Sequence, residues 1–278
     1  MTNTEVCPIA EMKNILLATD GSEFSAGAVR EAIRFAQRCN SHLYVISIVE
    51  TNPEFEIYGP DVVEKIEKKT RSNLEKIKEQ ADREGISCET ISHRGENASE
   101  LIIKEAARIN ANVIIMGRRG RSGIKRLMMG SVTALVIGGA PCNVFVVPRA
   151  GELNCRRILV ATDGSEYSER AARETIEIAK RCSSSVMVIS VAEKEEYIPQ
   201  AEQHVNYVKD IAVSEGVQVE TFAVTGTPYE AISTTAQIKK ADLIVVGTRG
   251  RTGLQKLLMG SVAERVIALS HCTVLVVK

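Results

Sequence analysis

The sequence lacks several features by which whole classes of protein are recognised. It has no net charge, because 35 basic residues balance 35 acidic ones, and this argues against a nucleic-acid binder that relies on a positive field. No run approaches the roughly 20 consecutive apolar residues of a membrane-spanning helix. The first twelve residues are polar and contain Glu5 and Glu11, so they do not resemble a secretory signal. We therefore expect a cytoplasmic protein that binds neither nucleic acid nor membrane.

Cysteine and histidine are present but form no recognisable set of metal ligands. The seven cysteines include no Cys-x-x-Cys pair, and the four histidines share no ligand spacing, so we expect no zinc site. Cys39 and Cys182 occupy matching positions of an internal repeat, and so do Cys142 and Cys272. Single cysteines at matched positions are typical of small buried apolar residues in a reducing compartment. We therefore expect thiols rather than a disulfide framework.

The internal repeat is long. The segment KNILLATDGSEFS, which starts at Lys13, recurs 143 residues later as RRILVATDGSEYS from Arg156. The segment GRRGRSGIKRLMMGSV, which starts at Gly117, recurs only 130 residues later as GTRGRTGLQKLLMGSV from Gly247. The second copy is therefore shorter between the two motifs, and residues 51–60 have no clear counterpart in it.

A repeat of this length indicates a duplicated domain rather than a small solenoid unit. We expect one domain at residues 1–149 and a second at 150–278, because a short polar segment with Pro and Gly lies between the copies at residues 148–154. A chain of 278 residues is long enough for two such domains, each with its own core.

Short apolar runs alternate with amphipathic stretches in each copy. In the first copy, runs rich in Val and Ile predict strands at residues 15–19, 43–49, 86–93, 113–116 and 144–147. Helical spacing of apolar residues predicts helices at 25–39, 62–84, 99–109 and 131–138. The second copy repeats this order. Such alternation predicts an α/β fold, with a parallel sheet covered by helices on both faces.

The last expected strand of each copy is short and apolar. These strands run from Val144 to Val147 and from Val274 to Val277. Because exposed apolar edges invite pairing, we expect the two strands to pair within one chain and make a pseudo-two-fold dimer. We also expect that two chains can associate further into a homodimer.

Ligands of such sheets bind at the carboxyl ends of the strands, and one motif falls where the first strand of each copy ends. Its residues are Ala18, Thr19 and Asp20 in the first copy, and Ala161, Thr162 and Asp163 in the second. The aspartate can be a helix N-cap, although Ser22 or Ser165 also fits that role. It can equally accept ribose hydrogen bonds or lie beside a divalent cation. The sequence leaves both interpretations open.

A glycine-rich loop follows the fourth expected strand. Gly117-x-x-Gly120 is followed, after nine residues, by Gly130 and Ser131. The second copy repeats this spacing with Gly247, Gly250, Gly260 and Ser261. Glycine lets a backbone approach a ligand, and loop amides with a helix N-terminus favour an anion. The loop therefore predicts phosphate binding, with a merely structural connection as the alternative. It contains neither the Gly-Lys-Ser/Thr of a P-loop nor a GxGxxG fingerprint.

Basic residues lie between these glycines. They are Arg118, Arg119, Arg121, Lys125, Arg126, Arg249, Arg251 and Lys256. Two interpretations stay open: a solvated loop surface, or added attraction for phosphate or for an acidic partner.

Together the two motifs resemble the universal stress protein family in its tandem two-domain form, and the similarity covers nearly the whole chain twice. The resemblance implies two tandem five-stranded parallel-sheet domains of order 3-2-1-4-5, of the adenine nucleotide alpha hydrolase-like type, joined through antiparallel last strands. Members with the full glycine loop form the ATP-binding branch of the family.

The resemblance also implies a role for each motif residue. Asp20 and Asp163 would lie near the ribose and near any Mg²⁺ or Mn²⁺ bound with the nucleotide, and Ile48 and Val191 would offer backbone hydrogen bonds to adenine. The residues lining ribose and phosphates would be Met116, Gly117, Arg119 and Gly120, and Val246, Gly247, Arg249 and Gly250. Those closing on the phosphates would be Gly130, Ser131 and Val132, and Gly260, Ser261 and Val262.

The resulting hypothesis is a stress-response or regulatory protein that binds ATP or AMP, with one site in each domain. No histidine lies in either motif and no general base is identified, so any ATP hydrolysis is expected to be slow. Two alternatives remain, a slow ATPase or phosphotransferase and a scaffold whose sites are relics. The shorter second crossover leaves the relative affinity of the two sites open.

Overall fold

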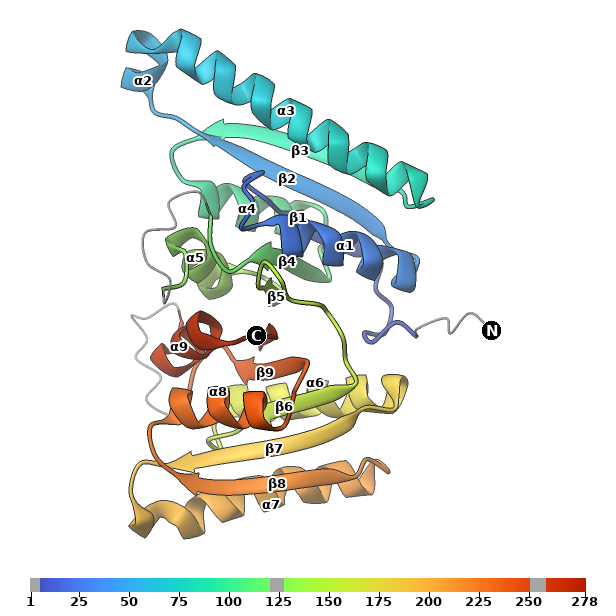
Figure 1. The fold of residues 1–278 in the computed structure, drawn as a ribbon, viewed down its shortest axis with the longest axis vertical. Helices are drawn as coiled ribbons and strands as arrows, with labels where there is room; N and C mark the ends of the chain where they lie inside the picture. Colours follow the sequence, from blue (N-terminus) through green and yellow to red (C-terminus); the bar gives the residue numbers. More distant parts are fainter. Residues whose placement is uncertain (1–5, 121–127, 251–258) are drawn as a thin grey trace.

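The protein forms a single ten-stranded sheet covered by helices. The computed structural model describes residues 6–120, 128–250 and 259–278. The strands follow the order β3-β2-β1-β4-β5-β10-β9-β6-β7-β8. Figure 1 shows the first half of the chain, through β5, above the second half, which starts at β6. None of the helices in the described ranges combines the length and apolar character that a bilayer crossing requires.

Strands and helices alternate along the first half. Its elements are β1 (Asn14–Ala18), α1 (Ala26–Cys39), β2 (His42–Glu50), α2 (Pro53–Tyr58), α3 (Pro60–Arg83), β3 (Cys88–Gly95), α4 (Ala98–Arg108), β4 (Val113–Gly117), α5 (Ser131–Gly139) and β5 (Asn143–Val147). The edge strand β3 begins two residues later than the predicted run 86–93. Helix α2 was not predicted, because six residues are too few to show a helical period.

The second half repeats this order. Its elements are β6 (Arg157–Ala161), α6 (Glu166–Cys182), β7 (Ser185–Ala192), the 3₁₀ turn η1 (Glu195–Tyr197), α7 (Ile198–Ser214), β8 (Val219–Thr225), α8 (Pro228–Ile238), β9 (Leu243–Gly247), α9 (Ser261–Leu269) and β10 (Thr273–Val277). The two halves differ in length after their second strands. The first half has α2 and the 24-residue α3 there, whereas the second has η1 and the 17-residue α7.

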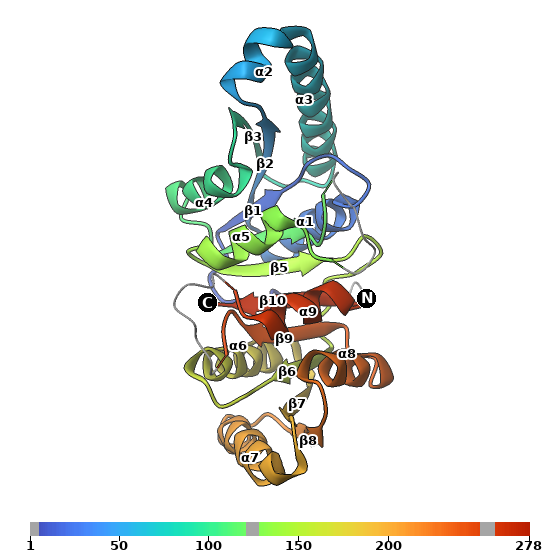
Figure 2. The same ribbon diagram turned by 90° about the vertical axis from the view of Figure 1, so that its left-hand side faces the viewer.

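Within each half the strands are parallel and follow the order 3-2-1-4-5, as predicted. The last strands, β5 and β10, pair antiparallel, with Phe145 opposite Leu275 and Val146 opposite Val274. Figure 2 shows these strands side by side at the middle of the molecule. The pairing joins the sheets of the two halves, so the carboxyl ends of the parallel strands of both halves belong to one sheet.

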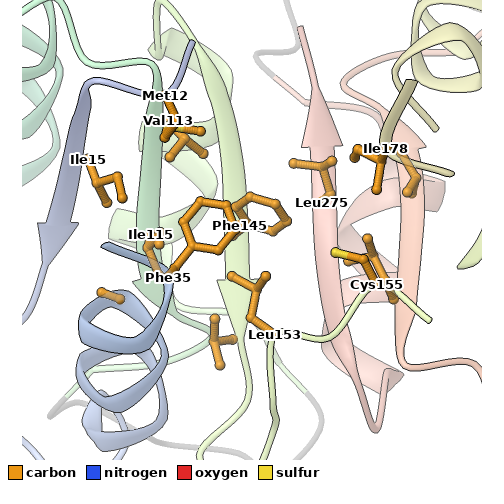
Figure 3. Packing of buried hydrophobic residues seen from close by; sticks show 14 of the residues in the cluster. Met12, Ile15, Phe35, Val113, Ile115, Phe145, Leu153, Cys155, Ile178 and Leu275 are labelled. Carbon is orange, nitrogen blue, oxygen red and sulfur yellow. The ribbon is translucent and has the colours of Figure 1, made fainter. Parts of the chain in front are cut away.

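The core has two layers, one on each face of the sheet, and each layer extends through both halves. Helices α1, α3, α6 and α7 cover one face, and α4, α5, α8 and α9 cover the other. The Phe145 ring meets the Phe35 ring edge to face, with centroids 5.5 Å apart. Figure 3 shows Phe35 and Phe145 on one side of the junction and Leu275 on the other. Apolar packing is therefore continuous across the junction.

Two cations also join the halves. Arg118 Nη1 donates to the carbonyl oxygens of Ala268 at 3.1 Å and Ser270 at 2.8 Å, at the end of α9. Lys278 Nζ donates to those of Ile137 and Gly138, at 2.7 and 2.9 Å, at the end of α5. The last carbonyls of a helix lack intrahelical partners and attract positive charge. Each half therefore caps a helix of the other.

The expectation for one cysteine is wrong. Cys39 is not a reduced apolar residue but forms a disulfide with Cys7, whose Cα atom is 4.7 Å away. Cys7 lies in the segment before the repeat, so it has no counterpart that a comparison of the two copies could reveal. This segment reaches the end of α1, where Cys39 is the last residue. Cys142, Cys182 and Cys272 keep their thiols.

Candidate functional site

The Asp-Gly-Ser turn after the first strand is built alike in both halves. Asp163 Oδ1 accepts hydrogen bonds from Ser165 N and Ser165 Oγ at 3.1 and 2.6 Å. Asp20 Oδ1 accepts the corresponding bonds from Ser22 at 3.0 and 2.7 Å. The glycine between them has a φ of +75° or +68°, in the left-handed region that favours glycine. The turn thus fixes one carboxylate oxygen of each aspartate.

The aspartates do not cap the helices that follow them. Ser165 is the N-cap of α6, and its Oγ accepts from Ser168 N at 3.4 Å. Ser25 occupies the N-cap of α1. The N-cap interpretation of Asp20 and Asp163 is therefore wrong, and so is that of Ser22.

The second carboxylate oxygen of each aspartate faces the glycine-rich loop. A β-carbon at Gly250 would lie 2.6 Å from Asp163 Oδ2, and one at Gly120 would lie 2.8 Å from Asp20 Oδ2. Glycine at this position therefore leaves room for the carboxylate. The two sequence motifs, far apart along the chain, meet at this contact in both halves.

Two further glycines shape the loop in the second half. A β-carbon at Gly247 would lie 2.7 Å from the backbone of Tyr167, so only glycine lets β9 end so close to α6. Gly260 is the extended N-cap residue of α9, and its N–H donates to Thr248 O at 2.9 Å. In the first half Gly130 N–H donates to Arg118 O at 3.0 Å. The glycine N-cap thus ties the helix N-terminus to the strand end.

Ser131 and Ser261 are the first residues of α5 and α9. Amides in the first turn of a helix have no intrahelical acceptor and lie at the positive end of the helix dipole. Both helix N-termini are therefore suited to an anion.

The described basic residues of the loops, Arg118, Arg119 and Arg249, do not act as one group. Arg121, Lys125, Arg126, Arg251 and Lys256 lie outside the described residues. Arg118 fits neither interpretation given to it, because its side chain caps α9 of the other half. Burial lowers the pKa of Arg118, and the charge of Arg119 lowers it further.

The other two described arginines of the loops stay within their own halves. Arg119 Nε donates to Met128 O at 2.9 Å. The Arg249 guanidinium lies 5.8 Å from the centre of the Tyr167 ring. Both side chains are half-buried at the strand ends.

A cavity of about 570 Å³ opens beside the ends of β6, β7 and β9. The second-half residues that the sequence analysis placed in the candidate nucleotide site all line it. These residues are Ala161, Thr162, Asp163, Val191, Val246, Gly247, Arg249, Gly250, Gly260, Ser261 and Val262. The fold therefore gathers two motifs and a third strand around one space.

The corresponding residues of the first half lie at the ends of β1, β2 and β4 and at the start of α5. Ala18, Thr19, Met116 and Gly117 are buried, Ser131 is exposed, and the half-buried ones are Asp20, Ile48, Arg119, Gly120, Gly130 and Val132. The Asp20–Gly120 contact and the Gly130–Arg118 hydrogen bond repeat those of the second half.

Several residues that line the cavity carry no motif. Glu193, Tyr197, Gln200 and His204 come from the crossover between β7 and β8, the last two from α7. None of these four residues, His204 among them, was predicted from the sequence to line a site. A lone histidine on an amphipathic helix gives no sign of the cavity, but it aligns with Asn73 of the first copy, and that difference was a usable signal.

The model of the universal stress protein family matches residues 11–148 and again 154–278. The chain belongs to the universal stress protein family. A universal stress protein of Methanocaldococcus jannaschii is 39% identical over 146 residues, which are 47% of this chain and 86% of that protein. A putative universal stress protein of Staphylococcus aureus strain USA300 is 33% identical over 138 residues, 49% of this chain and 83% of that one.

The tandem arrangement also has a counterpart among solved structures. The crystal structure of a universal stress protein from Archaeoglobus fulgidus DSM 4304 aligns with a TM-score of 0.78 and 24% identity. The alignment covers 96% of this chain and 99% of that one. At this identity the likeness shows a shared fold.

Proposed function

We propose that the chain binds adenine nucleotides, ATP or AMP, at one site in each half, and that it acts as a sensor or regulator in the stress response. The observation that supports this most is the cavity of about 570 Å³ in the second half. Its volume falls within the range of about 300 to 1,000 Å³ that small-molecule sites occupy.

The cavity offers chemistry suited to each part of a nucleotide. The start of α9, with Gly260 and Ser261, presents amides and a hydroxyl to phosphate. Val191 and Val246 offer apolar surface to a base. Asp163 Oδ2, which faces the loop, is an acceptor for ribose hydroxyls. The same oxygen fits Mg²⁺ or Mn²⁺ carried by the phosphates, because such ions usually take only one or two protein carboxylates.

We propose binding rather than fast catalysis as the role of both sites. Phosphate release from ATP with Mg²⁺ or Mn²⁺ should stay near background. A rate well above background would favour a slow ATPase or phosphotransferase instead, and nucleotide-independent capture of a partner would favour a scaffold.

We also propose how the chain is organised. The domains are residues 1–149 and 150–278, the β5–β10 pairing makes them an internal pseudo-two-fold dimer, and the protein works in the cytoplasm. Two chains form a homodimer, which sedimentation would show as twice the mass of one chain.

The test of nucleotide binding uses the loop glycines that face the aspartates. ATP or AMP at a concentration 100 times its dissociation constant should add about 2.7 kcal/mol to the free energy of unfolding for each occupied site, seen as a higher melting temperature. Calorimetric titration of the unchanged protein should give two nucleotides per chain. G250A should remove the second-half site, because the β-carbon displaces the Asp163 carboxylate, and G120A should remove the first-half site.

Each variant is the control for the other, because both introduce one methyl group at matched positions. Both must keep the melting temperature of the unchanged protein when no nucleotide is present. Failure of millimolar ATP and AMP to raise the melting temperature of the unchanged protein would refute the proposal.

A further inference from the structure

The two sites differ in the side chain that faces the Asp-Gly-Ser turn. In the second half a β-carbon at Gly164 would lie 2.5 Å from His204 Nε2. In the first half a β-carbon at Gly21 would overlap the side-chain nitrogen of Asn73. Asn73 and His204 therefore hold the same place, on the helices α3 and α7 that follow the second strands. The two turns therefore differ in this neighbour: an amide faces the Gly21 turn, and an imidazole faces the Gly164 turn.

His204 is held so that one ring nitrogen faces the turn. Its Nδ1 lies 3.2 Å from the hydroxyl oxygen of Ser190, in β7, and Ser190 is only 2% exposed. Nε2 is directed to Gly164, and the ring lines the cavity. The buried hydroxyl thus orients the imidazole toward the space beside Asp163.

The first half offers a neutral donor at this place. Asn73 Nδ2 is buried and has no hydrogen-bond partner within residues 6–120, 128–250 and 259–278. A buried donor without a partner is costly, and a ligand acceptor beside the Gly21 turn would satisfy it. In the second half the equivalent side chain, His204, also points toward the turn glycine, but it is an imidazole rather than an amide.

The charge around His204 decides what its protonation does. Among the described residues, the charged and titratable groups that line the cavity with it are Asp163 after β6, Glu193 after β7, Tyr197 in η1 and Arg249 after β9. Among side-chain types, imidazole is the one that ordinarily changes charge between about pH 5 and pH 8. In its protonated form both ring nitrogens donate hydrogen bonds, so Nδ1 can bond to Ser190 while Nε2 donates to a ligand.

We propose that His204 is a ligand-binding residue that sets the second site apart from the first: its protonated ring binds the anionic nucleotide. The second site therefore binds nucleotide more tightly as the pH falls, and the first site, with Asn73, lacks this contribution. This inference rests on the proposed nucleotide binding. A bound polyanion favours the imidazolium, and by linkage protonation of the ring favours the bound polyanion.

The size of the effect follows from one coupled proton. A ligand that raises the imidazole pKa by one unit binds about tenfold more tightly below both pKa values than above them. Nucleotide phosphates also titrate near pH 6, so a pH profile of the unchanged protein alone is insufficient. The titration of the phosphates affects binding to a variant and to the unchanged protein equally. The difference between their pH profiles therefore reports on His204 alone.

The experiment is an exchange of the two side chains, with ATP as the probe. Calorimetric titrations at about pH 5 and about pH 8.5, on either side of the range in which imidazole titrates, are made with the unchanged protein, H204N, N73H and the double exchange. In H204N the second site should lose its pH-dependent gain of about tenfold. N73H should give the first site the same gain, and the double exchange should move the gain from the second site to the first.

The possible failures are distinct. Two-site ATP binding with the same pH profile in H204N and the unchanged protein would overturn the role of His204 and leave the proposed function intact. Absence of ATP binding to the unchanged protein at both pH values would refute the proposed function itself. H204Q, which also keeps a neutral side chain with a donor, should behave as H204N does, and it replaces H204N if that variant melts early.

Discussion

Replacing Arg118 with alanine should weaken the junction between the two halves. The half-buried guanidinium makes two well-placed hydrogen bonds to carbonyl oxygens at the end of α9, at 3.1 and 2.8 Å, and a third contact, to Ile267 O, at 3.4 Å. A hydrogen bond to a charged group contributes about 1.5 to 3 kcal/mol. Burial of the charged guanidinium opposes this stabilisation, and the same burial lowers the pKa of Arg118. We therefore expect R118A to lose about 2 kcal/mol of the free energy of unfolding.

Urea unfolding followed by circular dichroism measures this loss. For a chain of this size each kcal/mol corresponds to about 2 to 4 °C in melting temperature. R83A is the matched control, because Arg83 donates to a carbonyl of its own helix, Glu79 O, at 3.1 Å, and is exposed. It should change the free energy of unfolding by less than about 0.5 kcal/mol. If R118A is no less stable than R83A, the helix cap across the junction does not contribute to stability.

Two other substitutions test the core and one buried carboxylate. F145A should cost about 3 to 5 kcal/mol in urea unfolding, because Phe145 is fully buried between Phe35 and Leu275; a loss below about 1 kcal/mol would contradict the packing. Burial raises the pKa of Glu105, but hydrogen bonds from Arg108 and His93 outweigh it and hold that pKa below its ordinary value. A lowered folded-state pKa stabilises above the unfolded-state pKa, and this stabilisation is lost as the pH falls through the folded-state value. E105Q should therefore be less stable at pH 7 and should approach the unchanged protein near pH 3, and an equal difference at both pH values would rule this out.

The fold was largely predictable, because buried parallel strands are nearly continuous apolar runs. Ile15, Leu16 and Leu17 of β1 are 0% exposed, and such runs mark the central strands directly. The edge strand β3 has only one apolar face, and its predicted bounds were accordingly displaced by two residues. The disulfide between Cys7 and Cys39 was not predictable from the repeat, because Cys7 lies outside it.

The parts of the site that were predictable are those where the close approach of another group leaves room only for glycine. Gly250 is glycine because the Asp163 carboxylate lies against it. The absence of a side chain at this position is visible in the sequence as a conspicuous glycine motif. The positions of His204 and Arg118 depend instead on where a helix or a neighbouring half lies in space. The aligned copies reveal that Asn73 and His204 differ, but the direction of these side chains and the contacts of Arg118 emerged only from the three-dimensional arrangement.

The covalent union of the two halves has a consequence for how the protein can diverge. A single-domain chain that paired with its own copy through its last strand would carry every substitution at both sites at once. In this chain each copy mutates separately, although the two are always made in equal numbers. Arg118 corresponds to Thr248, and Asn73 to His204, so the internal symmetry is already broken beside both loops. Gene fusion of this kind lets one site specialise while its neighbour keeps the ancestral chemistry.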